Sequence, residues 1–157
     1  MSYDYNHAYD YDELNPQPVT REQLDGVRTA RIFSFLVDYV IVALLTIPFA
    51  ILVGIFGLLT FGLGWALYAV LPALVAVFYL AITMGGPNQS TIGMGMMGIK
   101  IRKLEGGRVD PFLAALHGIL FWVFAAFPPL LLISLVSSKK RLLHDILLGT
   151  YVVKTDI

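Results

Sequence analysis

Cysteine is absent from this chain of 157 residues, and charged side chains make up only 14% of it. Without a thiol the protein has neither a disulfide framework nor a thiolate metal site, and its cysteine usage indicates nothing about its redox compartment. In an ordinary soluble domain about a quarter of the residues are charged. Because 57% of this chain is hydrophobic, the composition predicts an integral membrane protein whose main partner is the lipid bilayer.

The acidic and basic groups balance to a net charge of zero, but they are unevenly placed. Residues 1–26 contain six acids and one arginine, a balance of −5, so the remaining 131 residues carry +5. The basic groups of that second part gather at the ends of apolar runs, which is how a multi-pass membrane protein is oriented. This placement differs from the basic stripe of a nucleic-acid-binding protein, and no nucleic-acid partner is expected.

Residues 1–26 are predicted to be a disordered acidic tail, and residues 27–157 to be the membrane domain. The tail has no apolar period that indicates a core, and its four tyrosines stand among acids and small polar residues (Tyr3, Tyr5, Tyr9 and Tyr11). Two interpretations remain open for it. The tail either solvates the protein or is a docking segment that recruits a cytoplasmic protein.

Three hydrophobic segments occupy residues 32–56, 62–84 and 111–136. As a helix, about 20 apolar residues cross a hydrocarbon core of ~30 Å, so the first two are predicted to be transmembrane helices. The third contains Pro128-Pro129, and two consecutive prolines remove two backbone donors and break a helix. The predicted fold is therefore an all-α integral membrane protein with two transmembrane helices and a third segment broken in its middle.

Lysines and arginines predict how this fold is oriented. They flank the start of the first segment and the end of the second, which places both flanks in the cytoplasm (Arg21, Arg28, Arg31, Lys100, Arg102, Lys103 and Arg108). Residues 98–104 and 150–154 are short β-prone runs that can pair as a small cytoplasmic strand element only if both lie on one face of the membrane. We therefore expect a cell-membrane protein with cytoplasmic N- and C-termini. Its third segment would then re-enter, although a simple crossing stays open.

The run from Gly93 to Gly98 matches the pattern G-x-G-x-x-G. A dinucleotide site needs that pattern between a strand and a helix of a βαβ unit. Here the run follows an apolar segment and leads into a β-prone one, so no cofactor is expected. The glycines are predicted instead to let a methionine-rich turn lie close against the bilayer or a neighbouring helix.

Arg31 and Asp38 are seven residues apart, so on an α-helix they share one stripe, about two turns and ~10 Å apart. An aspartate within a membrane costs ~2.5–3.5 kcal/mol on insertion scales and needs a polar partner, a wet cavity or a proton. His117, near the start of the third segment, is a candidate partner for Asp38, and such a pair would exchange a proton near neutral pH. The alternative of equal weight is that His117 bonds only to a backbone carbonyl.

Residues 142–147 have the apolar spacing of an amphipathic helix at the membrane interface, closed by Gly149 as its C′ residue. Asp145 lies within this helix. If the C-terminus is cytoplasmic, Asp145 shares a face with Arg31. A bidentate pair between the Arg31 guanidinium and the Asp145 carboxylate is therefore predicted.

Three blocks of the sequence, Arg31 to Asp38, Thr91 to Ile101 and Arg141 to Val153, resemble the RDD family in order and spacing, over about residues 27–154. The family is named for one arginine and two aspartates, which would be Arg31, Asp38 and Asp145 here. Two positions depart from the family pattern: Met94 stands where many members have a lysine, and His117 where they often have an arginine. The resemblance implies a membrane protein with a suggested transport role, linked in a few members to sodium/proton exchange.

Two functions follow as hypotheses. In the first, a homo-oligomer transports a cation or a proton, with Asp38 and His117 as its binding groups and Arg31 and Asp145 as a cytoplasmic latch. In the second, the chain is a non-transporting membrane assembly or partner-binding protein, whose charged residues lock its fold and whose tail recruits a cytoplasmic factor. Neither a nucleophile–base pair nor a metal-ligand spacing is evident, so no catalytic residue, enzyme activity or metal site is expected.

Overall fold

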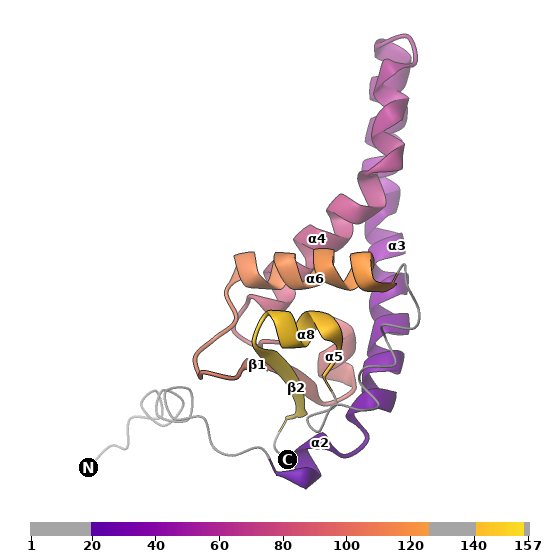
Figure 1. Cartoon of the computed structure of the whole chain (residues 1–157). Coiled ribbons are helices and arrows are strands. Elements are labelled where there is room, and N and C mark those ends of the chain that lie inside the picture. Colours follow the sequence, from indigo (N-terminus) through magenta and orange to yellow (C-terminus); the bar gives the residue numbers. More distant parts are fainter. Residues whose placement is uncertain (1–19, 126–140, 156–157) are drawn as a thin grey trace, which may run out of the picture.

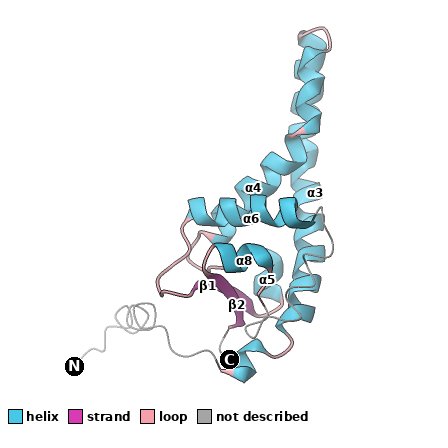
Figure 2. Ribbon diagram, in the orientation of Figure 1, coloured by secondary structure: helices cyan, strands magenta, loops and turns pink. Residues whose placement is uncertain are grey.

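The computed structural model describes residues 20–125 and 141–155 of the chain (Figure 1). Helices dominate this part, and two short strands form the rest of its regular structure (Figure 2). In chain order the elements are α2 (Arg21–Leu24), α3 (Val27–Leu59), the 3-10 helix η1 (Leu63–Ala69), α4 (Leu71–Met84), α5 (Ile92–Met96), β1 (Ile99–Lys103), α6 (Pro111–Ala125), α8 (Leu143–Leu147) and β2 (Thr150–Lys154).

Helix α3 forms the long arm of the molecule (Figure 1). Its 33 residues correspond to a length of about 50 Å at ~1.5 Å per residue. Pro48 lies inside α3 without ending it, and the Thr46 hydroxyl donates a hydrogen bond of 2.7 Å to the Val42 carbonyl. Within the described residues, α3 is the helix that is by itself long and apolar enough to cross a membrane. It coincides with the first predicted segment.

The second predicted segment, residues 62–84, is wrong as a single helix. Helices η1 and α4 are bent by 53° relative to one another, and only as a bent pair do they qualify as a membrane span. Pro72 gives the reason, because it is within the first two residues of α4 and has no N–H to continue a helix from η1. Together, η1 and α4 return alongside α3 (Figure 1).

The described part of the third predicted segment is α6, which packs against α4, and one end of which lies near α3 (Figure 1). The side chain of Asp110 caps this helix by accepting a hydrogen bond of 2.9 Å from the Leu113 amide. Helix α6 is apolar but shorter than a membrane span. The predicted break at Pro128-Pro129 lies outside the described residues.

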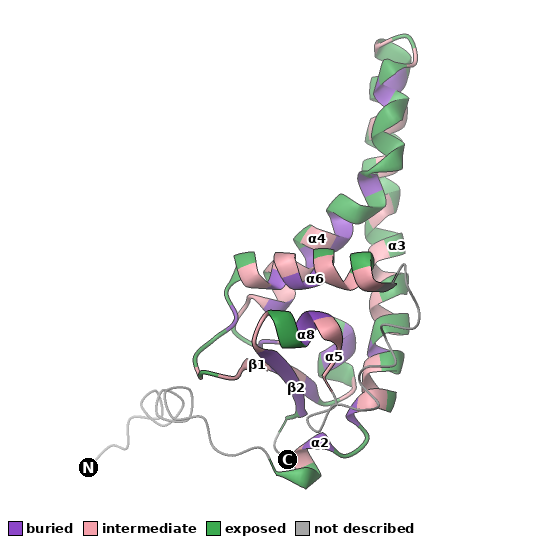
Figure 3. Cartoon of the chain, in the orientation of Figure 1, coloured by how far each residue is buried: buried purple, intermediate pink, exposed green. Residues whose placement is uncertain are grey.

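The predicted pairing of two β-prone runs is confirmed. Strands β1 and β2 are antiparallel, with a register from Ile99 opposite Lys154 to Lys103 opposite Thr150. Side chains from this small sheet, from α3, α4, α5 and α6 and from the loop before α6 make one buried core (Val27, Met84, Met94, Ile99, Ile101, Val109, Ala114 and Val152). Burial is concentrated around this sheet, whereas the far end of the α3 and η1 hairpin is largely exposed (Figure 3).

The predicted tail, residues 1–26, extends too far along the chain. Thr20 and Gln23 form a capping box that starts α2, which satisfies two backbone amides at the helix start. Leu24 is buried against Tyr151 and Val153 of β2. The folded part therefore begins by Thr20, and it places the start of α3 and the strand β2 at the same end of the molecule (Figure 1).

The methionine-rich turn is α5. Of the two predicted neighbours, the bilayer and a neighbouring helix, the structure shows the helix, because α5 packs against α3. A Cβ added at Gly93 would collide with the Ser34 carbonyl oxygen and lie 2.8 Å from the Asp38 Cγ atom. Gly98 and Gly149 both have φ of +62°, a left-handed conformation that glycine adopts without strain. Gly149 directly follows the C-cap of α8, which is the predicted C′ position.

Substituting Gly93→Ala is expected to destabilise the fold by at least ~1–3 kcal/mol, the usual cost of overpacking, because backbone and the Asp38 carboxylate fill the space. Gly95→Ala, two residues along the same helix, is the matched control, since its nearest neighbour would be the Ser90 Oγ atom at 3.7 Å. Denaturant titration of both purified variants measures the difference. Equal stability of the two variants would contradict the close approach of α5 to α3.

Candidate functional site

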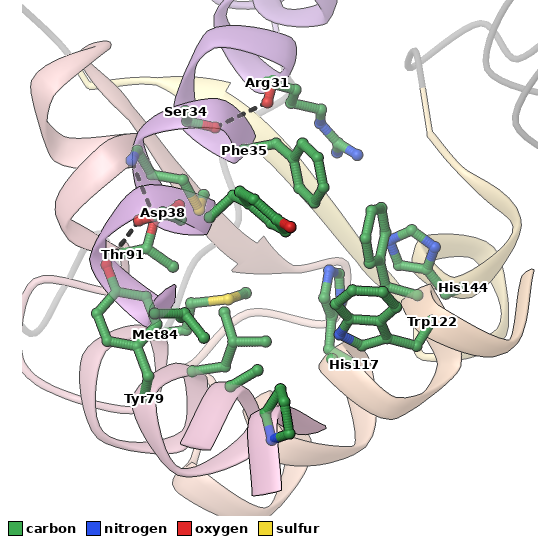
Figure 4. Close-up of a pocket in the computed structure, with 18 of the residues that line it drawn as sticks. Arg31, Ser34, Phe35, Asp38, Tyr79, Met84, Thr91, His117, Trp122 and His144 are labelled. Carbon is green, nitrogen blue, oxygen red and sulfur yellow. Dashed lines mark hydrogen bonds between the residues drawn. The ribbon is translucent and has the colours of Figure 1, made fainter. Parts of the chain in front are cut away.

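Asp38 is the centre of a hydrogen-bond network that joins three helices. Its carboxylate accepts hydrogen bonds from the Tyr79 hydroxyl of α4 at 2.6 Å, from the Thr91 hydroxyl at 2.6 Å and from the Gly93 amide of α5 at 2.8 Å (Figure 4). Bonds from neutral donors to an ionised acceptor are worth ~1.5–3 kcal/mol each. The network therefore fixes α4 and α5 against the polar stripe of α3.

Two of these donors are themselves positioned by α5. The Thr91 hydroxyl accepts a hydrogen bond of 3.0 Å from the Met94 amide, as the N-cap of α5. The Tyr79 hydroxyl accepts one of 3.1 Å from the Ile92 amide. Each hydroxyl thus accepts a hydrogen bond from a backbone amide of α5 and donates one to Asp38, so both are oriented as donors to the carboxylate.

The proposed contact between Asp38 and His117 is absent from the described residues. His117 Nε2 lies 3.6 Å from Asp145 Oδ1, and its Nδ1 atom is buried without a hydrogen-bond partner in the described part, so the carbonyl alternative is not realised there either. The physical reason is that the hydroxyls of Tyr79 and Thr91 already occupy the Asp38 carboxylate.

Arg31 and Asp145 form the predicted pair, but not the bidentate one. A single contact of 2.6 Å joins Arg31 Nη1 to Asp145 Oδ2, and the same oxygen accepts a hydrogen bond of 3.0 Å from the Leu142 amide. Asp145 is fully buried. Its second oxygen, Oδ1, faces two imidazoles rather than the guanidinium fork, which explains why the pair is not bidentate.

His144 belongs to this cluster and was not predicted as a site residue. Its Nε2 atom lies 3.6 Å from Asp145 Oδ1, at the same distance as His117 Nε2. The two imidazole rings meet edge to face, with centroids 4.4 Å apart. The sequence signal for His144 is its position immediately before Asp145 within an apolar run, because a histidine there has few other polar groups to contact.

Burial and the nearby Arg31 charge set the protonation states of the two titratable side chains of α8, His144 and Asp145. Burial lowers the pKa of the His144 imidazole to about 4, although the Asp145 carboxylate opposes this shift. Burial alone would raise the pKa of Asp145, but the Arg31 guanidinium reverses that effect and holds this pKa below its usual value. At neutral pH, α8 therefore presents a neutral imidazole beside a carboxylate that is paired with a guanidinium.

A cavity of about 440 Å³ lies between α3, α4 and α6 and separates the two polar groups. Asp38, Tyr79 and Thr91 lie on one side of it, and His117 and His144 on the other (Figure 4). The rest of its wall is mostly apolar and includes Phe35, Met84, Phe121 and Trp122. A carboxylate in such a wall can hold a cation or exchange a proton.

Across the cavity, His117, His144 and Asp145 bring three potential metal-ligand atoms within 4.8 Å of one another.

Comparison with known proteins supports the resemblance seen in the sequence. No curated protein and no solved structure matches the chain. The family model described as the RDD family matches residues 26–149. That match covers most of the 157 residues and includes Arg31, Asp38 and Asp145, the three residues that hold the described helices together. The chain therefore belongs to the RDD family.

Proposed function

We propose that this RDD-family chain is an integral protein of the cell membrane whose α3 and η1–α4 hairpin lies in the bilayer. The supporting observation is an inverted distribution of side chains. Large apolar residues of α3 point outward, such as Leu36, Leu44 and Leu52, while Ser34 is buried. A soluble protein buries such apolar groups in its core, so lipid is the solvent that suits this surface.

The short helices follow the same inverted pattern. In α8, His144 and Asp145 are buried whereas Leu147 is exposed. In α6, His117 is buried whereas Trp122 is half-exposed. Polar groups that face inward and pair with one another are typical of ionisable residues at membrane depth.

The basic residues set the orientation of this hairpin. Arginines lie at the start of α3, and lysines and arginines lie in β1, which pairs with the C-terminal strand β2. By the positive-inside rule this end of the molecule is cytoplasmic. Both folded ends of the chain are then cytoplasmic, and the turn at Phe61 is on the other side of the membrane.

The cavity at Asp38 carries the functional proposal, which is binding and transport of a cation or a proton. Its wall contains the Asp38 carboxylate, whose hydrogen-bond donors are all neutral, whereas the positive charge of Arg31 is directed at Asp145. The Asp38 side of the cavity is therefore negative and suits a cation. A homo-oligomer would complete the pathway, because one hairpin and α6 scarcely enclose one.

The same contacts also favour a second candidate, a non-transporting membrane assembly or partner-binding protein. Three donors on Asp38 and the buried pair between Arg31 and Asp145 are what a fold-locking role requires. In that case residues 1–19 would recruit a cytoplasmic factor. Deleting residues 1–19 separates the candidates, since it abolishes partner binding but leaves transport intact.

The membrane topology can be tested with single cysteines, because the chain contains none. Phe61→Cys lies in the exposed turn after α3, and Glu105→Cys in the exposed turn after β1. A maleimide that cannot cross membranes is expected to label Phe61→Cys in intact cells and to label Glu105→Cys only after the cells are permeabilised. Labelling of both positions from outside would contradict the hairpin.

Transport can be tested by separating the charge of Asp38 from its structural contacts. Asp38→Asn removes the charge. Tyr79→Phe keeps the charge but removes the hydrogen bond to Asp38, worth ~1.5–3 kcal/mol, together with the one from the Ile92 amide. In proteoliposomes carrying a pH dye and a sodium or potassium gradient, Asp38→Asn is expected to reduce flux to the level of empty liposomes, while Tyr79→Phe retains most of it.

The comparison of Asp38→Asn with Tyr79→Phe also tests the second candidate, the non-transporting assembly or partner-binding role. If the wild-type chain catalyses no flux, or if Asp38→Asn and Tyr79→Phe reduce flux in parallel with their loss of folded protein in gel filtration, Asp38 only holds the fold. The non-transporting role then replaces the transport role.

A further inference from the structure

We propose that His117, His144 and Asp145 form a binding site for a divalent transition-metal ion of the zinc type. His117 comes from α6, and the other two residues come from α8. All three side chains are buried. Two imidazole nitrogens and one carboxylate oxygen are a ligand set that zinc and its neighbours in the first transition row accept. The site is distinct from the Asp38 network and goes beyond the proposed transport function.

The distances suit such an ion. Asp145 Oδ1 lies 3.6 Å from His117 Nε2 and 3.6 Å from His144 Nε2, and all three ligand atoms lie within 4.8 Å of one another. Around a tetrahedral zinc with bonds of about 2.0–2.1 Å, ligand atoms are roughly 3.3–3.4 Å apart. Small rotations of the side chains therefore close the site, whereas a separation of 3.6 Å is too long for a direct hydrogen bond.

The two oxygens of Asp145 have different partners. Oδ2 accepts hydrogen bonds from Arg31 Nη1 and from the Leu142 amide, whereas Oδ1 is buried and has no hydrogen-bond donor among the described residues. A buried acceptor without a donor costs free energy. A metal ion bound to Oδ1, with the two Nε2 atoms as its other ligands, would satisfy this oxygen.

Arg31 and Leu142 then act as outer-shell groups that orient the carboxylate. Ligating carboxylates are usually held by hydrogen bonds of this kind. The guanidinium contacts Oδ2, which leaves Oδ1 free for the ion.

His117 and His144 also line the cavity between α3, α4 and α6. Three protein ligands and access to a cavity are typical of a site with an open fourth position, taken by water or a solute, rather than of a closed structural site. Because the ligands come from α6 and α8, the bound ion would also tie these two helices together.

The test is metal binding by the whole chain, purified in detergent without a polyhistidine tag and stripped with a chelator. After equilibration with Zn²⁺ and dialysis, elemental analysis is expected to find one zinc per chain. His117→Gln and His144→Gln should each weaken zinc binding by more than the roughly 10–100-fold that loss of an outer-shell partner costs. Zinc should raise the Tm of the wild type but not of these variants.

His7 supplies the matched control, since it is the third histidine of the chain and lies in the acidic tail. His7→Gln is expected to bind zinc as the wild type does. Loss of binding in His7→Gln alone would assign the ion to the tail and overturn the proposal. The absence of stoichiometric zinc binding by the wild type would overturn it too, whatever the variants do in folding. Flux carried at Asp38 is measured separately and does not decide this result.

Discussion

The arrangement of the described helices depends on how the carboxylate of Asp38 on α3 is compensated by hydrogen-bond donors from neighbouring elements. Its hydrogen bonds come from Tyr79 on α4, from Thr91 and from the Gly93 amide of α5. Since α5 leads directly into β1, fixing α5 also fixes the strand on which β2 pairs. A single charge on α3 thus determines where the rest of the compact unit lies.

A second contact is made by a residue on the same stripe of α3, nearer its N-terminus. Arg31, two turns before Asp38, contacts the fully buried Asp145 and so holds α8 against α3. Removing one partner of a buried ion pair costs ~3–5 kcal/mol because the other charge is left uncompensated. The three residues for which the family is named are therefore clamps between distant parts of the chain. The Asp38 clamp and the histidines beside Asp145 border the cavity on which the transport and metal proposals rest.

Much of this could be predicted from the sequence, because it depends on periodicity and charge. A spacing of seven residues puts Arg31 and Asp38 on one stripe, and an acid near the C-terminus is the natural partner of the arginine. The donors on Asp38 could not be predicted, since nothing local marks Tyr79 or Thr91 as lying at the same depth. The bend between η1 and α4 could not be predicted from composition, because Pro72 in an apolar run is compatible both with a kinked helix and with the start of a new one. The cluster around His144 depends on how α6 crosses the hairpin, which no spacing encodes.

The most direct measurement is a double-mutant cycle for unfolding with Asp38→Asn and Tyr79→Phe. If their hydrogen bond joins α3 to α4, the two substitutions are expected to be non-additive by ~0.5–3 kcal/mol. The control cycle pairs Asp38→Asn with Tyr68→Phe, whose hydroxyl donates to the distant Ala50 carbonyl, and should be additive within about 0.3–0.5 kcal/mol. Additivity between positions 38 and 79 as well would contradict the role of the Asp38 carboxylate as the clamp between these helices.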